Sequence, residues 1–185
     1  MREIEDAIER AEREAFTREP PKTLKGQIRY LLKQMGGTKA VAQEIGVTAD
    51  SVNRYRRGAR KHARADIAVK IDDAVQQRWQ PQVRKRRQRQ AATTGGITVE
   101  TRARFGYTAP IGTTDDGRFR RLTVHLPPAY AQRLFDARDA GASDQQMRQI
   151  IADGFKEVYF QDSGARAAGL SDVAINDIDY LELDF

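Results

Sequence analysis

The chain has 185 residues, of which 32 are Lys or Arg and 26 are Asp or Glu, and its formal net charge is +6. It contains no cysteine and two histidines, which excludes a disulfide framework and a thiolate zinc site. Residues 1–96 hold 22 Lys or Arg against 12 Asp or Glu, whereas residues 97–185 hold 10 against 14, so we expect two domains, with nucleic acid bound by the first. No stretch has the character of a membrane span or a signal peptide, and we expect a cytoplasmic protein without membrane contact.

The beginning of the chain predicts two helices. In residues 3–16, apolar side chains recur at helical spacing among many acidic ones, which indicates an amphipathic helix. Pro20-Pro21 interrupts the pattern, and a second apolar series in residues 24–35 ends at Gly36-Gly37. We expect both helices to pack against the segment that follows.

Residues 38–57 predict a helix-turn-helix. The two helices of that motif cross closely, which requires a small residue on the first, a glycine at the turn and a β-branched residue on the second. Ala42, Gly46 and Val52 meet these requirements. The residues that do not face the other helix form a candidate surface for reading the DNA groove: Thr48, Ala49, Asp50, Asn53 and Arg54. The basic residues that follow this surface in the sequence are candidate contacts to DNA phosphates: Arg56, Arg57, Arg60 and Lys61. The alternative is an ordinary pair of amphipathic helices around a glycine turn.

The end of the first half is strongly basic. A helix is predicted over residues 67–79, and a short one from Pro81 carries Arg84, Lys85, Arg86, Arg87 and Arg89. Next to a helix-turn-helix we interpret this run as a phosphate-binding segment, with a solvated linker as the alternative. Residues 91–96 are small and polar and end in two glycines, which indicates an interdomain linker. The expected DNA-binding domain therefore spans residues 1–90 and the second domain residues 97–185.

In the second domain the apolar period changes from that of helices to that of strands. Residues 97–107 and 120–126 alternate apolar and polar side chains, and we expect them to pair as a hairpin closed by the loop 108–117. Two helices follow, then a loop over residues 161–176 and a third strand over residues 178–185. The predicted fold class is an N-terminal all-α domain followed by a small α+β domain in the order β-β-α-α-β.

Aromatic and basic residues interleave on both sides of the predicted loop. They fit a platform for single-stranded DNA, and they fit equally a hairpin with Phe105 and Phe119 in its core and arginines on its wet face. The candidate single-strand contacts are Arg102, Arg104, Tyr107, Arg118, Arg120 and Arg121. Tyr107 also suggests a DNA-nicking tyrosine, but the two distant histidines do not supply the clustered metal ligands of such an enzyme. Familiar catalytic motifs are missing, so we predict no enzymatic activity, no cofactor and no metal ion.

Several long runs carry a family likeness: RWQPQVR at residues 78–84, TRARFGY at 101–107, GTTDD at 112–116, LTVHLPPAY at 122–130, RLFDA at 133–137 and VYFQD at 158–162. Together they resemble the telomere terminal proteins of linear Streptomyces chromosomes and plasmids. The resemblance covers nearly the full length, and runs of this length are more specific than a short motif.

The resemblance implies a protein primer that becomes covalently attached to the 5′ ends of linear DNA and initiates the synthesis that patches the recessed end. It implies three partners at chromosome or plasmid ends in the nucleoid: telomeric DNA, a telomere-associated recruiting protein and a DNA polymerase. Family members are nucleotidylated on a threonine hydroxyl, which maps onto Thr114, and Thr113 is the competitor on chemistry alone. The alternative function is a helix-turn-helix transcriptional repressor with a C-terminal dimerisation domain, which has no need of an exposed threonine loop.

Overall fold

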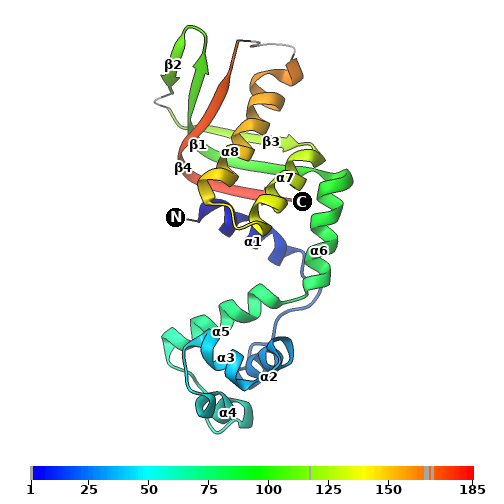
Figure 1. The fold of residues 1–185 in the computed structure, drawn as a ribbon, viewed down its shortest axis with the longest axis vertical. Helices are drawn as coiled ribbons and strands as arrows, with labels where there is room; N and C mark the ends of the chain where they lie inside the picture. Colours follow the sequence, from blue (N-terminus) through cyan, green and yellow to red (C-terminus); the bar gives the residue numbers. More distant parts are fainter. Residues whose placement is uncertain (1, 117, 165–166, 168) are drawn as a thin grey trace. The chain divides into compact units, whose positions relative to one another are not determined.

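A computed structural model describes residues 2–116, 118–164, 167 and 169–185. The chain divides into two compact units (Figure 1). Phe16–Pro81 forms the helical unit, and Met1–Ala15 with Gln82–Phe185 forms the mixed unit, which contains a four-stranded antiparallel sheet in its described part. The fold is thus mixed α and β, with helices first. Among the described helices, none is long and apolar enough to cross a membrane.

The helical unit consists of α2 (Leu24–Met35), α3 (Thr38–Ile45), α4 (Ala49–Arg57) and α5 (Ala65–Arg78). The predicted helix at α2 is confirmed, and residues 38–57 contain two helices with a turn between them. Each helix contributes one face to a shared apolar core, as helical spacing of apolar residues requires. The buried residues of this core are Ile28, Leu31, Val41, Ala42, Ile45, Val52, Tyr55, Ile67, Ile71, Ala74 and Val75.

Capping residues set the ends of these helices. Thr23 and Thr48 accept hydrogen bonds from the backbone N–H groups of Gly26 and Ser51, each at 3.2 Å, in the first turns of α2 and α4. These bonds satisfy N–H groups that have no acceptor within the helix. Gly46 ends α3 with a φ of 69°, a left-handed conformation that favours glycine. The sharp turn into α4 follows from that residue.

β1 (Ile97–Ala109) is the central strand of the sheet. Residues 98–103 of β1 pair on one side with β3 (Arg120–Leu126) and on the other with β4 (Asp172–Asp184), both antiparallel. The far end of β1 pairs with β2 (Gly112–Asp115) in a tight hairpin. The predicted pairing of the first two strands is therefore confirmed as that of β1 with β3.

Helices α7 (Pro128–Asp139) and α8 (Asp144–Gly154) pack on one face of this sheet (Figure 1). Alternate residues of the strands supply the sheet side of the core, and α1 (Glu3–Glu14) adds its apolar face. The alternate residues of β1 and β3, from Thr98 to Arg104 and from Arg121 to His125, are polar and exposed or half-buried, and we call the side of the sheet that carries them the open face. The largest fully buried side chains of the mixed unit are Phe105, Phe155, Ile4, Ile8, Ile97, Leu126, Leu134 and Met147.

The predicted DNA-binding domain of residues 1–90 is wrong, because α1 belongs to the mixed unit. Ile4 and Ile8 are fully buried in the core that contains the sheet. The backbone N–H of Ile4 also donates to Asp144 Oδ1 at 2.8 Å, which fixes the start of α1 to α8. An amphipathic pattern predicts that a helix buries one face, but it does not indicate which of two cores receives that face.

The predicted linker at residues 91–96 is also wrong. α6 (Pro81–Gln90) continues into the π-helical turn η1 (Ala91–Gly95), and Ala91 is buried. Gly96 has a φ of 70°, and a Cβ placed on it would lie 2.3 Å from the carbonyl oxygen of Leu126. The small residues here permit close packing, a role that composition alone does not distinguish from flexibility.

The predicted loop 108–117 is mostly a second hairpin. Its described part consists of the end of β1, a two-residue turn at Pro110-Ile111 and the strand β2, while Gly117 lies outside the described residues. The β-branched side chains of Thr113 and Thr114 suit a strand. The order of elements in this unit therefore gains a short strand between the two that were predicted.

The last strand begins earlier than predicted. β4 starts at Asp172, inside the predicted loop 161–176, and runs to Asp184. Its register with β1 shifts between Arg102 and Phe105, which disturbs the alternation of buried and exposed residues in the middle of β4. Only residues 178–185 therefore show the two-residue period in the sequence. Two short helical elements, η2 (Phe155–Phe160) and η3 (Asp162–Gly164), precede this strand.

Candidate functional site

One face of α4 carries the residues that were predicted to read DNA. All of them are exposed except the half-buried Asn53: Thr48, Ala49, Asp50, Asn53 and Arg54. Val52 and Tyr55 are buried beneath. Arg54 bonds to Asp50 at 2.7 Å, and both side chains are more than half exposed. An exposed pair of this kind is weak, so Arg54 can exchange Asp50 for a ligand at little loss.

Unpaired basic side chains extend this face. They are exposed and have no acidic partner within the part of the chain that the structure describes: Arg56, Arg57, Arg60 and Lys61. Sequence reasoning missed Lys25 of α2, which lies beside Gly58 at the end of α4, and Lys70 of α5, which lies beside Gly46 at the turn. Both lysines belong to other helices, so only the fold brings them to α4. The positive potential here suits a phosphate backbone.

The basic residues of α6 are divided between two faces. Four are exposed or half-buried: Lys85, Arg86, Arg87 and Arg89. Arg84 points inward, with a side chain 13% exposed, and its Nη1 atom donates to Glu12 Oε2 at 2.6 Å. The prediction that Arg84 contacts DNA is therefore wrong, because its charge is paired with a buried carboxylate.

The candidate single-strand arginines on the open face of the sheet are paired with carboxylates: Arg102 with Asp179 (2.5 Å), Arg104 with Asp177 (3.3 Å) and Arg121 with Glu100 (2.5 Å). Phe105 is fully buried, which favours the core interpretation for this ring. Phe119 is 37% exposed, and the guanidinium carbons of Arg102 and Arg104 lie 5.0 and 4.7 Å from its centroid. Arg118 is 84% exposed. The two aromatic rings thus do not form one continuous stacking surface.

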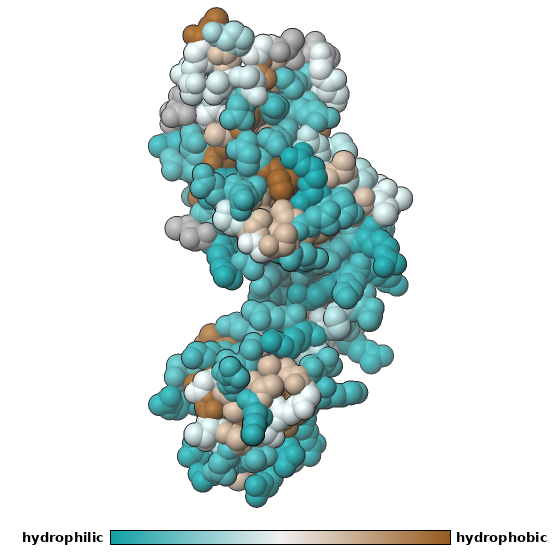
Figure 2. All heavy atoms as spheres, in the orientation of Figure 1, coloured by the Kyte–Doolittle hydropathy of each residue, from teal (hydrophilic) through white to brown (hydrophobic). Residues whose placement is uncertain are grey.

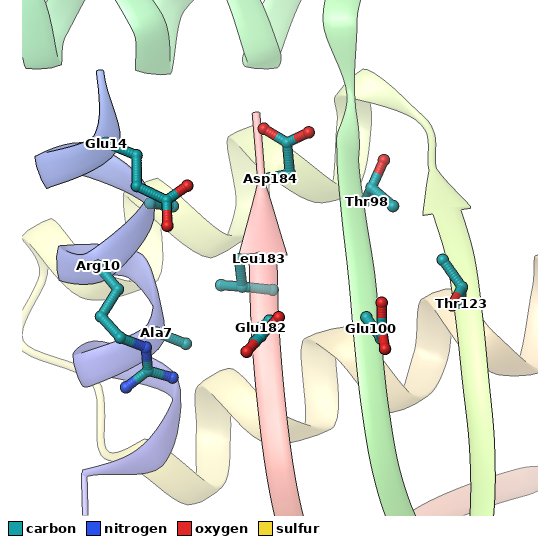
Figure 3. A pocket seen from close by; sticks show the side chains of 10 residues that line it. Ala7, Arg10, Glu14, Thr98, Glu100, Thr123, Glu182, Leu183 and Asp184 are labelled. Carbon is teal, nitrogen blue, oxygen red and sulfur yellow. The ribbon is translucent and has the colours of Figure 1, made fainter.

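A pocket of about 390 Å³ lies between α1 and the open face of the sheet (Figure 3). Its lining contains four carboxylates: Glu14, Glu100, Glu182 and Asp184. Hydrogen bonds from Arg121 and from the Tyr180 hydroxyl lower the pKa of Glu100. The surplus of negative charge repels phosphate, so this pocket is not a candidate nucleic-acid site. The described residues include no group of three or more His, Cys, Asp or Glu arranged to hold a metal ion.

Thr113 and Thr114 lie on β2 and point to opposite faces of the β1–β2 hairpin. Cross-strand partners share a face, and the pairs here are Thr113 with Thr108 and Thr114 with Tyr107. The hydroxyl oxygens of Thr108 and Thr113 are 3.3 Å apart and form a hydrogen bond. Thr114 is exposed, and no described residue hydrogen-bonds its hydroxyl. Of the two candidate threonines, Thr114 therefore has the unengaged hydroxyl.

β4 holds the hairpin on one side, because it pairs with β1 as far as Thr108, whereas β2 is an edge strand in the described part of the sheet. Ser171 donates to the Thr108 carbonyl oxygen from its backbone N–H at 2.8 Å and from its hydroxyl at 2.9 Å. The backbone N–H of Asp116 donates to the Phe105 carbonyl oxygen at 2.8 Å. Ile111 at the tip is fully exposed, and Figure 2 shows apolar surface at this end of the mixed unit. β2 thus stands on a projection that a partner can approach.

Tyr107 does not have the environment of a nucleophile. Its ring packs against Phe160 with centroids 5.2 Å apart, and its hydroxyl is buried without a hydrogen-bond partner among the described residues. Burial raises the pKa of Tyr107 above its ordinary value of 10.0. A higher pKa means less tyrosinate at neutral pH, so the DNA-nicking interpretation loses support.

Comparisons with known proteins give no independent assignment. No family model matches the chain. Neither the search of curated proteins nor that of solved structures found a match. The function of the chain is therefore inferred from its own residues and their geometry.

Proposed function

We propose that this chain is a DNA-binding terminal protein, a protein primer that becomes covalently linked to the 5′ end of linear DNA through Thr114. Its partners are telomeric DNA, a DNA polymerase that nucleotidylates it and a telomere-associated protein that recruits it. The observation that carries the proposal is the β1–β2 hairpin, where Thr114 presents its hydroxyl on an anchored projection within a run that resembles terminal proteins. A primer hydroxyl must enter a polymerase cleft, and such a projection allows it to do so.

In this scheme the chain is a substrate and not an enzyme. Thr114 Oγ1 attacks the α-phosphorus of a deoxynucleoside triphosphate, a phosphodiester bond forms, pyrophosphate leaves and the hydroxyl proton passes to water. The divalent metal ions of the polymerase lower the pKa of the attacking hydroxyl, as they do for a nucleotide primer. No general base beside Thr114 is required, which agrees with the lack of a catalytic motif in the sequence.

We further propose that α3 and α4 act as a helix-turn-helix, with α4 in the major groove. The support is local: Ala42 and Val52 are buried between the helices, and Gly46 supplies the left-handed turn. The exposed face of α4 then meets base edges, and the basic residues around it meet phosphates. A surface rich in unpaired Lys and Arg is what counterion release on DNA requires.

Replacing Arg54 by alanine should weaken DNA binding by about 1–3 kcal/mol without unfolding the helical unit. The side chain is exposed, and its pair with Asp50 contributes only about 0.3–0.5 kcal/mol to stability. Anisotropy of a labelled duplex measures binding, and fluorescence of Trp79, the single tryptophan, reports the folding of this unit. Arg54→Lys keeps the charge but loses a bidentate base contact, so it should recover only part of the affinity. Melting of the unit by Arg54→Ala would show that α4 is in a different register.

The exposed basic face of α6 should contribute to affinity without contributing to sequence preference. Replacing Lys85, Arg86 and Arg89 together by glutamine should weaken binding to every duplex about equally and flatten the slope of log affinity against log salt by roughly 0.9 per lost contact. Arg13→Gln is a matched control, because Arg13 is an exposed arginine of α1 already paired with Glu9. An unchanged slope in the triple variant would identify α6 as a solvated segment.

The priming proposal is tested by incubating the whole chain with a DNA polymerase, the recruiting protein and a radiolabelled deoxynucleoside triphosphate. We expect label that remains on the protein after denaturation. The same polymerase extending an ordinary DNA primer controls for its activity. DNA binding without any label, under conditions where that control works, would favour a transcriptional repressor instead.

A further inference from the structure

Strand alternation places Thr114, Tyr107 and Arg120 on the same face of the sheet. On β1, Phe105 is buried toward the helices, and Tyr107, two residues later, faces the same way. On β3, Leu122 is buried toward the helices, and Arg120, two residues earlier, shares its face. Thr114 shares the face of its cross-strand partner Tyr107, with Cβ atoms about 4.5–5.5 Å apart in such pairs. A hydroxyl, a phenol and a guanidinium therefore occupy one corner of the sheet.

Two further aromatic rings close this corner. Phe160 packs against Tyr107 and against Tyr159, with centroids 5.2 and 5.0 Å apart, and Tyr159 is 39% exposed. Arg120 bonds to Asp116 at 2.7 Å. That hydrogen bond is the largest cause of the raised pKa of Arg120, and the nearby Tyr107 and Tyr159 raise it further. The guanidinium thus stays charged beside two phenols.

The donors of this corner are only partly used. The buried hydroxyl of Tyr107 has no hydrogen-bond partner among the described residues, an arrangement that destabilises a folded protein. Arg120 donates its Nε–H to Asp116 Oδ2 at 2.7 Å, its Nη2 lies 2.7 Å from the same oxygen, and its side chain remains 39% exposed. Phenol and guanidinium donors on one face of the sheet complement a phosphoryl group, whose oxygens only accept.

We propose that Tyr107 and Arg120 form a binding site for the phosphodiester group that joins Thr114 to its nucleotide. This inference rests on the proposed priming function and adds to it the residues that hold the product. The bond-forming step is the one already written: Thr114 Oγ1 bonds to the α-phosphorus, pyrophosphate leaves and the proton passes to water. The non-bridging oxygens of the new diester accept from the Arg120 guanidinium and the Tyr107 hydroxyl, with Tyr159 at the solvent side of the site.

The Tyr107→Phe variant distinguishes loss of this binding site from loss of the folded structure. It removes a hydroxyl that makes no hydrogen bond to a described residue and keeps the ring that packs on Phe160. The unmodified variant should therefore melt at the same temperature as the wild type or higher. Nucleotide attachment should slow by about tenfold, the value expected for one lost hydrogen bond to a charged group. A purely structural role for Tyr107 predicts the reverse pattern, a lower melting temperature and unchanged labelling.

Arg120→Gln and Arg118→Gln form a matched pair. Both arginines contact Asp116, but the Arg118 side chain is 84% exposed, against 39% for Arg120. Arg120 lies on the face of Thr114 and Tyr107, whereas Arg118 precedes β3 and belongs to no strand. Arg120→Gln should slow attachment by tenfold or more, whereas Arg118→Gln should not change it.

The deciding measurement is the phosphorus NMR spectrum of the whole chain after it has received one nucleotide and has been purified from the polymerase. We expect the diester resonance to differ from that of a free threonine–nucleotide diester. Tyr107→Phe and Arg120→Gln, labelled over longer incubations, should move it toward the free value, and Arg118→Gln should not. A wild-type resonance at the free value, or equal shifts in Arg118→Gln and Arg120→Gln, would overturn the site while leaving priming intact. If no adduct forms on the wild type, both proposals fail together.

Discussion

Thr114→Val should abolish covalent nucleotide labelling of the chain. Valine keeps the β-branched shape that suits β2 and removes only the hydroxyl, so the hairpin should persist while the attacking oxygen is lost. No described residue hydrogen-bonds the Thr114 hydroxyl, so its removal breaks no hydrogen bond within the described hairpin. Labelling is measured by the radioactivity that remains on the denatured protein, and DNA affinity should be unchanged.

Thr113→Val is the matched control on the neighbouring residue. Its hydroxyl faces the other side of the hairpin and is hydrogen-bonded to Thr108 at 3.3 Å. The variant loses that bond but keeps the oxygen of Thr114, so it should still be labelled. Continued labelling of Thr114→Val, or loss of labelling only in Thr113→Val, would assign priming to a different hydroxyl.

Glu12→Ala should destabilise the mixed unit by about 3–5 kcal/mol, the range expected when one partner of a buried ion pair is removed. Glu12 is 1% exposed and accepts from Arg84 of α6 at 2.6 Å, from Arg138 of α7 at 2.8 Å and from Gln88 at 2.5 Å. Its loss removes the buried carboxylate that two largely buried guanidinium groups share. The same change separates α1 from α6 and α7, so cooperative unfolding of this unit should begin earlier.

Urea denaturation followed by circular dichroism measures this effect, since Trp79 lies in the helical unit and its fluorescence follows that unit. Glu14→Ala controls for the loss of a negative charge on the same helix. Glu14 is exposed and has no ion-pair partner in the described residues, so its replacement should change stability by no more than about 0.5 kcal/mol. Equal effects of the two variants would mean that Glu12 is not the buried centre of this cluster.

Local sequence signals predicted the helical unit well. Thr48 and Gly46 determine helix ends through a side chain and a backbone conformation of their own, and these effects reach only a few residues along the chain. Helical spacing of apolar residues also identified the buried face of α4, including Val52 and Tyr55. These predictions succeeded because both the cause and its effect lie within one or two turns.

Long-range pairing explains the predictions that were wrong. Arg84 has the same composition around it as Lys85 and Arg86, yet its partner Glu12 is 72 residues away in the chain. Glu12 in turn looks like one more solvated acid of α1, although Arg138, 126 residues away, also bonds to it. The spacing of residues along the sequence does not indicate such long-range pairs. Sequence patterns therefore do not distinguish a buried charge from an exposed one.

The candidate priming site was predicted in part. The sequence indicated a turn-rich segment with Thr113 and Thr114, and the structure adds a strand that gives the two threonines opposite faces. From the sequence, Tyr107 was interpreted as a candidate nucleophile or stacking residue. The burial of its hydroxyl could not be predicted, because the ring that packs against it, Phe160, is 53 positions later in the sequence. Side-chain orientation on a strand depends on register, which the sequence of a short hairpin does not fix.

The central claim is tested most directly by the mass of the protein recovered from nuclease-treated ends of linear DNA. The account predicts that the peptide containing Thr114 carries the added mass of one nucleotide monophosphate, and that fragmentation places this mass on Thr114. An unmodified peptide, or an adduct located on Tyr107 or Thr113, would contradict it.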